Sequence, residues 1–391
     1  MSWLPELWFD VFTRLPPKYL LQLRCVCKTW NSIIKSPTFI RAQLNQSIAN
    51  KNNNGTLFLR HCDEDKKQHF TIHKKNESFG EDYAEIGFPF RGTKRKFNFI
   101  GFCGWPVHSL EHVHRKFISI PKPHHIGIAH FMGFGVDSKN GDSKVVRVVC
   151  PARSNPQSPP KAEVYSLSLR LWRYISGDVI DSFRISLWNR LAFVNGVLHW
   201  IALSISENMD EKAILILSYR IADDRFQKMP LPQSSLIENR EPIDSFKLSI
   251  GEYQGLLAIF QNEKLSWTNL GSCRIWMMEK YGVEEPWTNL FKIDPPGGIG
   301  VVIGFRKNGE GILEMGNEDT LVDAARRRQM ATYDIQTHQV RGFEIRGCFN
   351  LFYVDNNYVE SLLLLEGDLY MEYDGNRGNI GIAGNANFAQ I

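Results

Sequence analysis

Residues 215–229, LILSYRIADDRFQKM, contain a strand, a turn and a second strand, and this pattern occurs four times in the chain of 391 residues. The other copies are AEVYSLSLRLWRYI at 162–175, RIWMMEKYGVEEPW at 274–287 and MATYDIQTHQVRGFEI at 330–345. An aromatic residue occupies the equivalent position of each copy, and the four are Tyr165, Tyr219, Trp276 and Tyr333. Their separations of about 54, 57 and 57 residues indicate an internal structural repeat.

A turn motif precedes each aromatic residue with the same period. Its copies are Gly141-Asp142, Asn195-Gly196, Gln254-Gly255 and Asn308-Gly309. Asn-Gly is favoured in tight hairpin turns, because both of their central residues need positive φ. Two markers with one period predict a unit of four strands, which for residues 190–232 are RLAFV, VLHWIALS, AILILSYRI and RFQKMPLP.

A four-stranded unit of about 50 residues is typical of a β-propeller blade, which must bury its apolar face against the next blade. The four copies extend over roughly residues 130–355, and residues 56–365 have room for about six such units. We therefore predict an all-β propeller of about six four-stranded blades at 56–365. Residues 366–391 are rich in Gly and Asn and lack a helical period, so we expect a disordered tail there.

Residues 3–44, WLPELWFDVFTRLPPKYLLQLRCVCKTWNSIIKSPTFIRAQL, have apolar residues at helical spacing instead. Pro16-Pro17 and Ser36-Pro37 interrupt this pattern, because proline cannot continue a helix but suits its first turn. Short helices cannot bury this much apolar surface among themselves, so we expect the excess to dock against helices of another protein. An ordinary terminal helical hairpin is the alternative. We place the helices at 1–45 and a polar linker at 46–55.

Spaced motifs in the same stretch resemble an F-box. They are Leu4-Pro5-Glu6-Leu7, Val11-Phe12, Arg14-Leu15-Pro16, Val26-Cys27-Lys28-x-Trp30 and Ser36-Pro37-x-Phe39. The interval from Pro5 to Val11 is about one residue shorter than in the family pattern. The resemblance implies that the module binds a Skp-type adaptor and, through it, the cullin and RING subunits of a ubiquitin ligase. The apolar residues assigned to adaptor contact are Leu4, Pro5, Leu7, Val11, Phe12, Leu15, Pro16, Leu20, Leu23, Val26, Cys27, Trp30, Ile33, Ile34 and Phe39.

Motifs along the repeat region are similar to the plant F-box-associated domain. They are Met132-Gly133-Phe134-Gly135-Val136-Asp137, Glu163-Val164-Tyr165-Ser166-Leu167, Asn195-Gly196-x-Leu198-His199-Trp200 and Trp276-Met277-Met278-x-x-Tyr281-Gly282-Val283. Tyr358-Val359-Glu360-Ser361-Leu362 resembles the S-locus F-box group within that family. The family's N-G-L-V-C-L strand and W-N-P turn are missing before residues 115–121, which indicates either a trimmed blade or an altered gene model. The expected fold class is α+β multidomain, with a short all-α F-box followed by the all-β propeller.

The net charge of +4 is carried by residues 1–45, and the rest of the chain is balanced. A nucleic-acid-binding domain would show a basic face backed by a charge excess, so we expect no nucleic acid partner for the repeat region. The distribution fits an acidic protein partner for the helices, and a solvated basic helix face explains it equally well.

Seven cysteines without a C-x-x-C pair predict free thiols in a reducing compartment, so we expect the protein in the cytoplasm, the nucleus or both. No apolar run approaches the length of a membrane span, since even Ser361-Leu362-Leu363-Leu364-Leu365 is strand-sized. We therefore expect no membrane partner.

We expect no cofactor, no metal site and no catalysis by the chain itself. Cys103, His108, His112 and His114 lack the close pairs and the closed set of four ligands that zinc sites use. The sequence contains neither a G-x-x-x-x-G-K-[ST] phosphate-binding loop nor a G-x-S-x-G nucleophile elbow.

Long, dissimilar loops are expected to connect the second strand of each unit to the third. They are residues 153–161, 204–212, 261–272 and 316–328. Long insertions on one face of a repeat protein usually mark its binding face, so we predict that a protein target binds there. Trp267 is the candidate anchor, and Arg326, Arg327 and Arg328 are candidates for an acidic contact. The alternative is that these loops are merely tolerant surface.

Together these features predict the substrate-recognition subunit of a Skp–cullin–F-box (SCF-type) ubiquitin ligase, which promotes ubiquitination and proteasomal degradation of a protein target. If the S-locus resemblance extends to function, the target is an S-locus ribonuclease in self-incompatibility. The alternatives are an F-box scaffold or decoy that binds without degradation and, with less support, a propeller enzyme.

Overall fold

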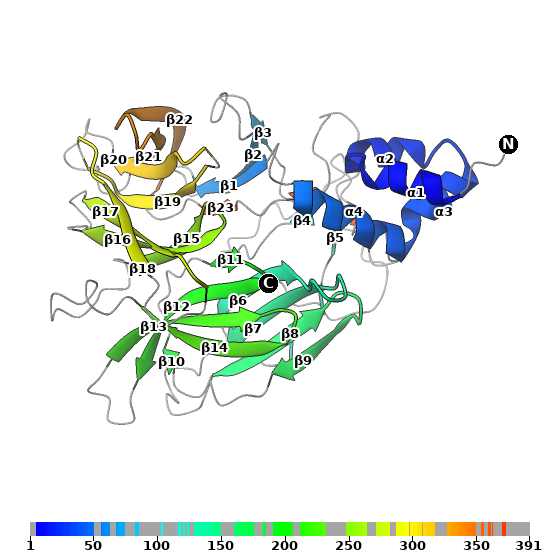
Figure 1. The fold of residues 1–391 in the computed structure, drawn as a ribbon, viewed down its shortest axis with the longest axis horizontal. Helices are drawn as coiled ribbons and strands as arrows, with labels where there is room; N and C mark the ends of the chain where they lie inside the picture. Colours follow the sequence, from blue (N-terminus) through cyan, green and yellow to red (C-terminus); the bar gives the residue numbers. More distant parts are fainter. Residues whose placement is uncertain are drawn as a thin grey trace. The chain divides into compact units, whose positions relative to one another are not determined.

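The computed structural model divides the chain into two compact units, which we describe separately (Figure 1). The first comprises Met1–Phe58, Thr71–Lys122 and Asp355–Ile391, and the second comprises Leu59–Phe70 and Pro123–Val354. The structure describes residues 5–50, 56–62, 68–74, 83–85, 103–104, 116–118, 120–121, 123–124, 129–149, 160–175, 183–184, 191–205, 212–231, 248–263, 271–281, 287–296, 298–306, 308–316, 327–348, 353–355, 359–360, 362 and 370–372.

The first unit begins, within its described residues, with the four helices at the N-terminal, blue end of the chain in Figure 1. They are α1 (Pro5–Thr13), α2 (Pro17–Leu23), α3 (Lys28–Lys35) and α4 (Pro37–Asn50). Proline is the first residue of three of them, where its fixed φ suits the helix and its missing N–H costs no bond.

The fourth helix is longer than the sequence indicated. Because α4 ends at Asn50, residues 46–50 of the stretch that we expected to be a linker are helical. Gln43 Nε2 donates a 2.8 Å hydrogen bond to Ser47 Oγ one turn further on. This bond engages the Ser47 hydroxyl with a side chain one turn earlier, so the hydroxyl does not compete for the helix backbone.

Short strands pair with distant segments in the first unit. β24 (Val359–Glu360) is parallel to β4 (Cys103–Gly104), and β25 (Tyr370–Glu372) is antiparallel to β5 (Lys116–Ile118). β25 lies within the stretch that we expected to be a disordered tail, and β5 supplies partners for its backbone that no local pattern reveals. The rest of 366–391 and most of the blade that we expected to be trimmed lie outside the described residues.

A further sheet has the strand order β23-β1-β2-β3. Its strands are β23 (Tyr353–Asp355), β1 (Thr56–Cys62), β2 (Gln68–Lys74) and β3 (Tyr83–Glu85).

Most described residues of the second unit lie in four antiparallel sheets, one for each predicted repeat. The first contains β6 (Ala129–Val136), β7 (Ser143–Val149), β8 (Lys161–Ser166) and β9 (Leu171–Ile175). The second contains the four strands of its repeat, β11 (Ala192–Val194), β12 (Val197–Ile205), β13 (Lys212–Arg220) and β14 (Arg225–Pro230). It also contains a fifth strand, β10 (Phe183–Arg184), which pairs with β12. The third contains β15 (Leu248–Tyr253), β16 (Leu256–Glu263), β17 (Ser272–Met278) and β18 (Trp287–Ile293). The fourth contains β19 (Val301–Phe305), β20 (Gly311–Gly316), β21 (Arg327–Tyr333) and β22 (Val340–Cys348). The four-stranded repeat is confirmed, whereas the total of about six blades stays a prediction.

The recurring turn motif joins the first two strands of each repeat. In the second sheet Asn195 and Gly196 have φ of 52° and 75°, and in the third Gln254 and Gly255 have φ of 50° and 81°. Positive φ at both central residues matches the right-handed twist of the two strands that a hairpin turn connects. The turn motif therefore recurs because each repeat needs the same backbone reversal.

The recurring aromatic residue lies on the third strand of each repeat, and in two repeats its hydroxyl bonds the turn that follows. The Tyr219 hydroxyl lies 2.7 Å from Asp224 Oδ1, and the Tyr333 hydroxyl lies 2.6 Å from His338 Nδ1. Asp224 and His338 have positive φ and belong to the turn between the third and fourth strands. Tyr219 and Tyr333 therefore each stabilise the turn residue five positions later.

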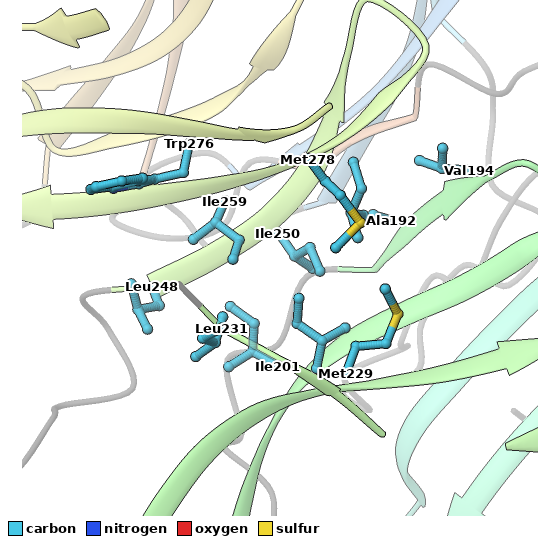
Figure 2. Packing of buried hydrophobic residues seen from close by; sticks show 12 residues of the cluster. Ala192, Val194, Ile201, Met229, Leu231, Leu248, Ile250, Ile259, Trp276 and Met278 are labelled. Carbon is cyan, nitrogen blue, oxygen red and sulfur yellow. The ribbon is translucent and has the colours of Figure 1, made fainter. Parts of the chain in front are cut away.

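Consecutive sheets of the second unit bury their apolar faces against each other. Figure 2 shows the cluster between the second and third sheets. Its buried members are Ala192, Val194, Ile201, Ile216, Met229, Leu231, Leu248, Ile250, Leu257, Ile259, Trp276 and Met278. A similar cluster joins the first sheet to the second and another joins the third to the fourth, as radially stacked blades require.

Lys144 lies at the junction of the first and second sheets with its ammonium group buried. Its Nζ atom lies 2.9 Å from Asp137 Oδ2 and 2.8 Å from Asp224 Oδ1, and it donates a 2.9 Å hydrogen bond to the carbonyl of Ile221. Burial lowers the pKa of Lys144, but the hydrogen bonds and charges of Asp224 and Asp137 outweigh burial and raise this pKa overall. Arg173 Nη2 lies 2.7 Å from the other oxygen of Asp224. These ion pairs therefore hold the two sheets together.

His199, on β12, is fully buried beside the third sheet. Its Nδ1 atom lies 3.3 Å from the carbonyl oxygen of Ala192, and its Nε2 atom lies 2.7 Å from the Tyr281 hydroxyl. A carbonyl can only accept, so we infer that Nδ1 carries the proton and that Nε2 accepts from Tyr281. Burial lowers the pKa of His199 to about 4, so the ring is neutral at pH 7.

Replacing Lys144 with Met is expected to lower the free energy of unfolding by about 3–5 kcal/mol, because Asp137 and Asp224 lose their buried cation. Urea denaturation at pH 7 measures the change. The matched control is Lys139→Met, which breaks the exposed pair between Lys139 and Asp223 and should have little effect. Equal losses in the two variants would contradict the prediction.

The free energy of unfolding is also expected to fall as the pH decreases from about 6.5 to about 4. In this window the unfolded chain binds a proton at His199 and the folded chain does not, which costs about 1.4 kcal/mol per pH unit. Above this window His199 is neutral in both states, so its contribution is fully present there. Urea denaturation across the pH range should give a shallower slope for His199→Gln, whose side chain does not titrate. An unchanged slope would exclude His199 as the cause.

Candidate functional site

The helices of the first unit carry apolar side chains on two sides. On α1 the side chains of Trp8, Phe9 and Phe12 pack into the helical core, whereas Leu7 and Val11, one turn apart, point outward. Nine large hydrophobic residues are exposed in the part of the chain that the structure describes, and four of them lie in this module. They are Leu7 (50% exposed), Val11 (49%), Tyr19 (51%) and Val26 (62%). This concentration makes the outer side of the helices our candidate binding face.

The V-C-K-x-W motif is a helix start. Cys27 is the N-cap residue of α3, and its Sγ atom accepts a 3.4 Å hydrogen bond from the backbone N–H of Trp30. The thiol thus replaces the hydroxyl or carboxylate that usually satisfies this free N–H. Our sequence analysis assigned Cys27 to the adaptor-contacting residues and did not identify its capping role.

The S-P-x-F motif connects two helices through one side chain. Ser36 Oγ donates a 2.8 Å hydrogen bond to the carbonyl of Ile33 at the end of α3 and accepts a 3.2 Å bond from the N–H of Phe39. Pro37 lies between them as the first residue of α4. The motif therefore fixes the angle between α3 and α4, and this angle directs Phe39 into the core.

Aromatic packing holds α1 against α3. The ring of Trp30 lies 4.8 Å from that of Trp8 and 5.1 Å from that of Phe12, measured between ring centroids. Phe9 contacts Phe39 of α4 edge to face, with 5.3 Å between centroids. Trp30 is therefore largely a packing residue that leaves only part of its surface for a partner.

The structure divides the residues that we assigned to adaptor contact into three groups. The exposed residues are Leu7, Val11, Pro16, Val26 and Cys27. The half-buried residues are Leu15, Leu23, Trp30 and Ile33. The buried residues are Phe12, Leu20, Ile34 and Phe39. Leu4 and the side chain of Pro5 lie outside the described residues. Sequence analysis missed Tyr19, because its position falls off the apolar stripe that was used to find the others.

Basic groups are exposed on the same helical module. The side chains of Lys28, Lys35 and Arg41 are exposed on α3 and α4. Arg14 is paired with Asp10 one turn earlier on α1, at 2.9 Å, and Arg24 donates to Asn31. The module thus presents exposed apolar residues together with positive charge, which suits an acidic partner surface.

The structure describes the backbone of two of the four predicted target-binding residues. Trp267 and Arg326 lie outside the described residues. Arg327 and Arg328 are the first residues of β21, where their backbones pair with Cys348 and Gly347 of β22, and their side chains are not described.

The described side chains show no group of three His, Cys, Asp or Glu placed to hold a metal ion. Of the four residues considered as zinc ligands, Cys103 is in β4, and His108, His112 and His114 lie outside the described residues. No helix in the described part of the chain is both long and apolar enough to cross a membrane.

Two family models match the chain. Residues 113–365 match the F-box associated beta propeller domain, and residues 1–42 match the F-box domain. The first match covers the four sheets of the second unit, and the second covers α1 to α3 with part of α4.

Several Arabidopsis thaliana proteins are similar to this chain over most of its length. F-box protein CPR1 is 24% identical over 318 residues, which are 73% of this chain and 72% of the relative. An F-box/kelch-repeat protein is 22% identical over 322 residues, covering 74% of this chain and 78% of the relative. Among solved structures, the beta-propeller domain of the Trilobed protease from Pyrococcus furiosus is 10% identical with a TM-score of 0.30, covering 74% of this chain and 66% of that chain. A score this low supports no argument.

Proposed function

Because this chain belongs to the family of F-box proteins with an F-box associated beta propeller domain, we propose that it is the substrate receptor of an SCF-type ubiquitin ligase. In this role the helices bind a Skp-type adaptor, which connects the chain to cullin and RING subunits. The propeller binds a protein target. The chain itself performs no catalytic step.

The observation that carries the proposal is the exposed apolar face of the helical module. Leu7, Val11, Tyr19 and Val26 are about half exposed or more, although the core beneath them is closely packed. Full burial of a fully exposed apolar side chain contributes about 1.5–3 kcal/mol, so each of these half-exposed side chains contributes roughly half as much. The four together contribute a few kcal/mol, and further contacts of the interface add to them to offset the entropic cost of binding. A helical partner with an apolar groove and acidic rim would match both the residues and the charge.

The propeller supports the receptor role through its geometry. We propose that the loops between the second and third strands of the repeats share one side of the propeller, since the four-stranded sheets repeat. These loops differ in sequence from blade to blade. We propose that they hold the target, with Trp267 as an apolar anchor and the arginines at 326–328 as contacts to acidic groups. Ubiquitin transfer would then be accelerated by proximity, since the ligase holds the target beside a charged conjugating enzyme.

We further propose that the bound target is degraded and that it is an S-locus ribonuclease. We also propose that the protein acts in the cytoplasm or the nucleus. These proposals rest on the motif resemblance near residues 358–362 and on a cysteine pattern without a C-x-x-C pair. A non-degradative scaffold or decoy would bind the same adaptor and target without ubiquitin transfer. Reconstitution with adaptor, cullin, RING and conjugating enzymes separates these alternatives.

Replacing Val11 and Val26 with Asp is expected to weaken adaptor binding at least about a hundredfold, because two carboxylates replace apolar groups at the interface. Isothermal titration calorimetry of the full chain with a purified Skp-type adaptor measures the change. The matched control is Leu169→Asp, an equally exposed leucine in the second unit, which should bind as the wild type does. Absence of binding by the wild type, or unchanged binding by the double variant, would refute the adaptor face.

Replacing Trp267 and the arginines at 326–328 with Ala is expected to reduce target capture at least about tenfold, because the apolar anchor and the positive charges are lost together. Adaptor affinity should stay at the wild-type value in this variant. Co-precipitation of targets with the full chain, followed by quantitative mass spectrometry, measures the loss. Undiminished capture would place the target on another face of the propeller.

A further inference from the structure

The core of the helical module contains a residue from a distant part of the chain. Leu362 is fully buried in the same cluster as Phe12, Leu20, Ile34 and Phe39. It lies just beyond β24, which is adjacent to α4 and pairs with β4 in the same compact unit. The F-box stretch of the sequence therefore does not close its own core.

The short length of the helices makes this contribution important. The helices α1, α2 and α3 have nine, seven and eight residues. Isolated helices of this length are unstable in water, so their stability depends on the apolar core that they share. Leu362 fills part of that core, and its removal would leave a cavity that short helices can close only by moving.

Helix α1 connects this core to the candidate binding face. Phe12 points inward to the cluster that contains Leu362, and its neighbour Val11 points outward among the exposed residues. Leu7 and Trp8 show the same division one turn earlier. A shift of α1 into a cavity in this core would therefore displace Leu7 and Val11, which the proposed adaptor would contact.

We propose that Leu362 is a positioning residue for adaptor binding, and that the binding module of this protein is assembled from residues 5–50 together with the segment around 359–362. This inference rests on the proposed adaptor-binding function. Leu362 does not touch the adaptor. It holds α1 and its outward side chains in the geometry that the adaptor recognises.

Thermodynamic linkage gives the proposal a second consequence. If the packed state of Leu362 favours adaptor binding, adaptor binding must favour the packed state by the same free energy. The backbone around 359–362 should therefore become more protected when the adaptor binds elsewhere on the module. A residue that merely fills space would show no such response.

The first experiment compares adaptor affinity of the full chain with that of Leu362→Ala, using a purified Skp-type adaptor. We expect affinity to fall roughly tenfold or more, because only the fraction of molecules with a packed module can bind. Leu362→Met, which conserves volume, should restore most of the affinity. The control is Leu313→Ala, since Leu313 is equally buried but belongs to the core between the third and fourth sheets. It should retain wild-type affinity.

The second experiment needs no variant, so it is independent of whether Leu362→Ala folds. Hydrogen exchange of the wild-type chain is measured by mass spectrometry with and without the adaptor, for peptides that cover residues 359–362. Slower exchange in the presence of adaptor supports the proposal. Adaptor binding by the wild type with unchanged exchange, or with unchanged affinity in Leu362→Ala, would overturn it. A wild-type chain that binds no adaptor would instead refute the proposed function.

Discussion

Burial of apolar side chains between consecutive sheets is the constraint on which the rest of the second unit depends. Along β12 the neighbours Trp200 and Ile201 belong to different clusters, the first shared with the preceding sheet and the second shared with the following one. Leu217 and Ile216 divide in the same way on β13. Both faces of β12 and β13 are therefore buried, which explains why these two strands are largely apolar. A sheet of this kind is stable only between two others.

The first and second sheets approach so closely that small residues are needed where they contact each other. A Cβ atom added to Gly133 on β6 would lie 2.7 Å from Leu198 Cδ1, too close for any real side chain. The Trp200 indole N–H donates a 3.3 Å hydrogen bond to the carbonyl of the adjacent Met132. The glycine and the tryptophan thus form one contact, in which the large residue of one sheet fills the space that the small residue of the other provides.

Charged groups that are buried between stacked sheets need a partner of opposite charge. The sequence did not reveal these ion pairs. The sequence predicted four sheets from two markers that recur about every 55 residues, a hairpin turn and an aromatic residue on the third strand. Both markers form their contacts within a single repeat, so a local pattern reveals them. Lys144 and Asp224 are 80 residues apart and share no local pattern, so only the stacked sheets show that they meet. The sequence also did not predict the burial of Leu362 in the helical core or the pairing of β25 with β5, because these contacts join residues that are far apart in the chain. Sequence analysis identified the helical module, because a period of three and four is a local property. It did not separate the exposed Leu7, Val11 and Val26 from the buried Phe12, Leu20, Ile34 and Phe39, because both groups follow the same spacing.

The helical module uses apolar side chains in two ways, to form its core and to form an exposed face. Burial of an apolar side chain stabilises the module but removes that side chain from the exposed face. The same side chain therefore cannot serve both purposes. Here adjacent residues of α1 serve separate purposes, since Trp8 and Phe12 pack with Trp30 while Leu7 and Val11 stay exposed. Because Leu362 completes the inner side from elsewhere in the chain, the helices need not turn Leu7 or Val11 inward to fill the core. The exposure of these residues is then a consequence of a core that is already full, and it persists until a partner covers them.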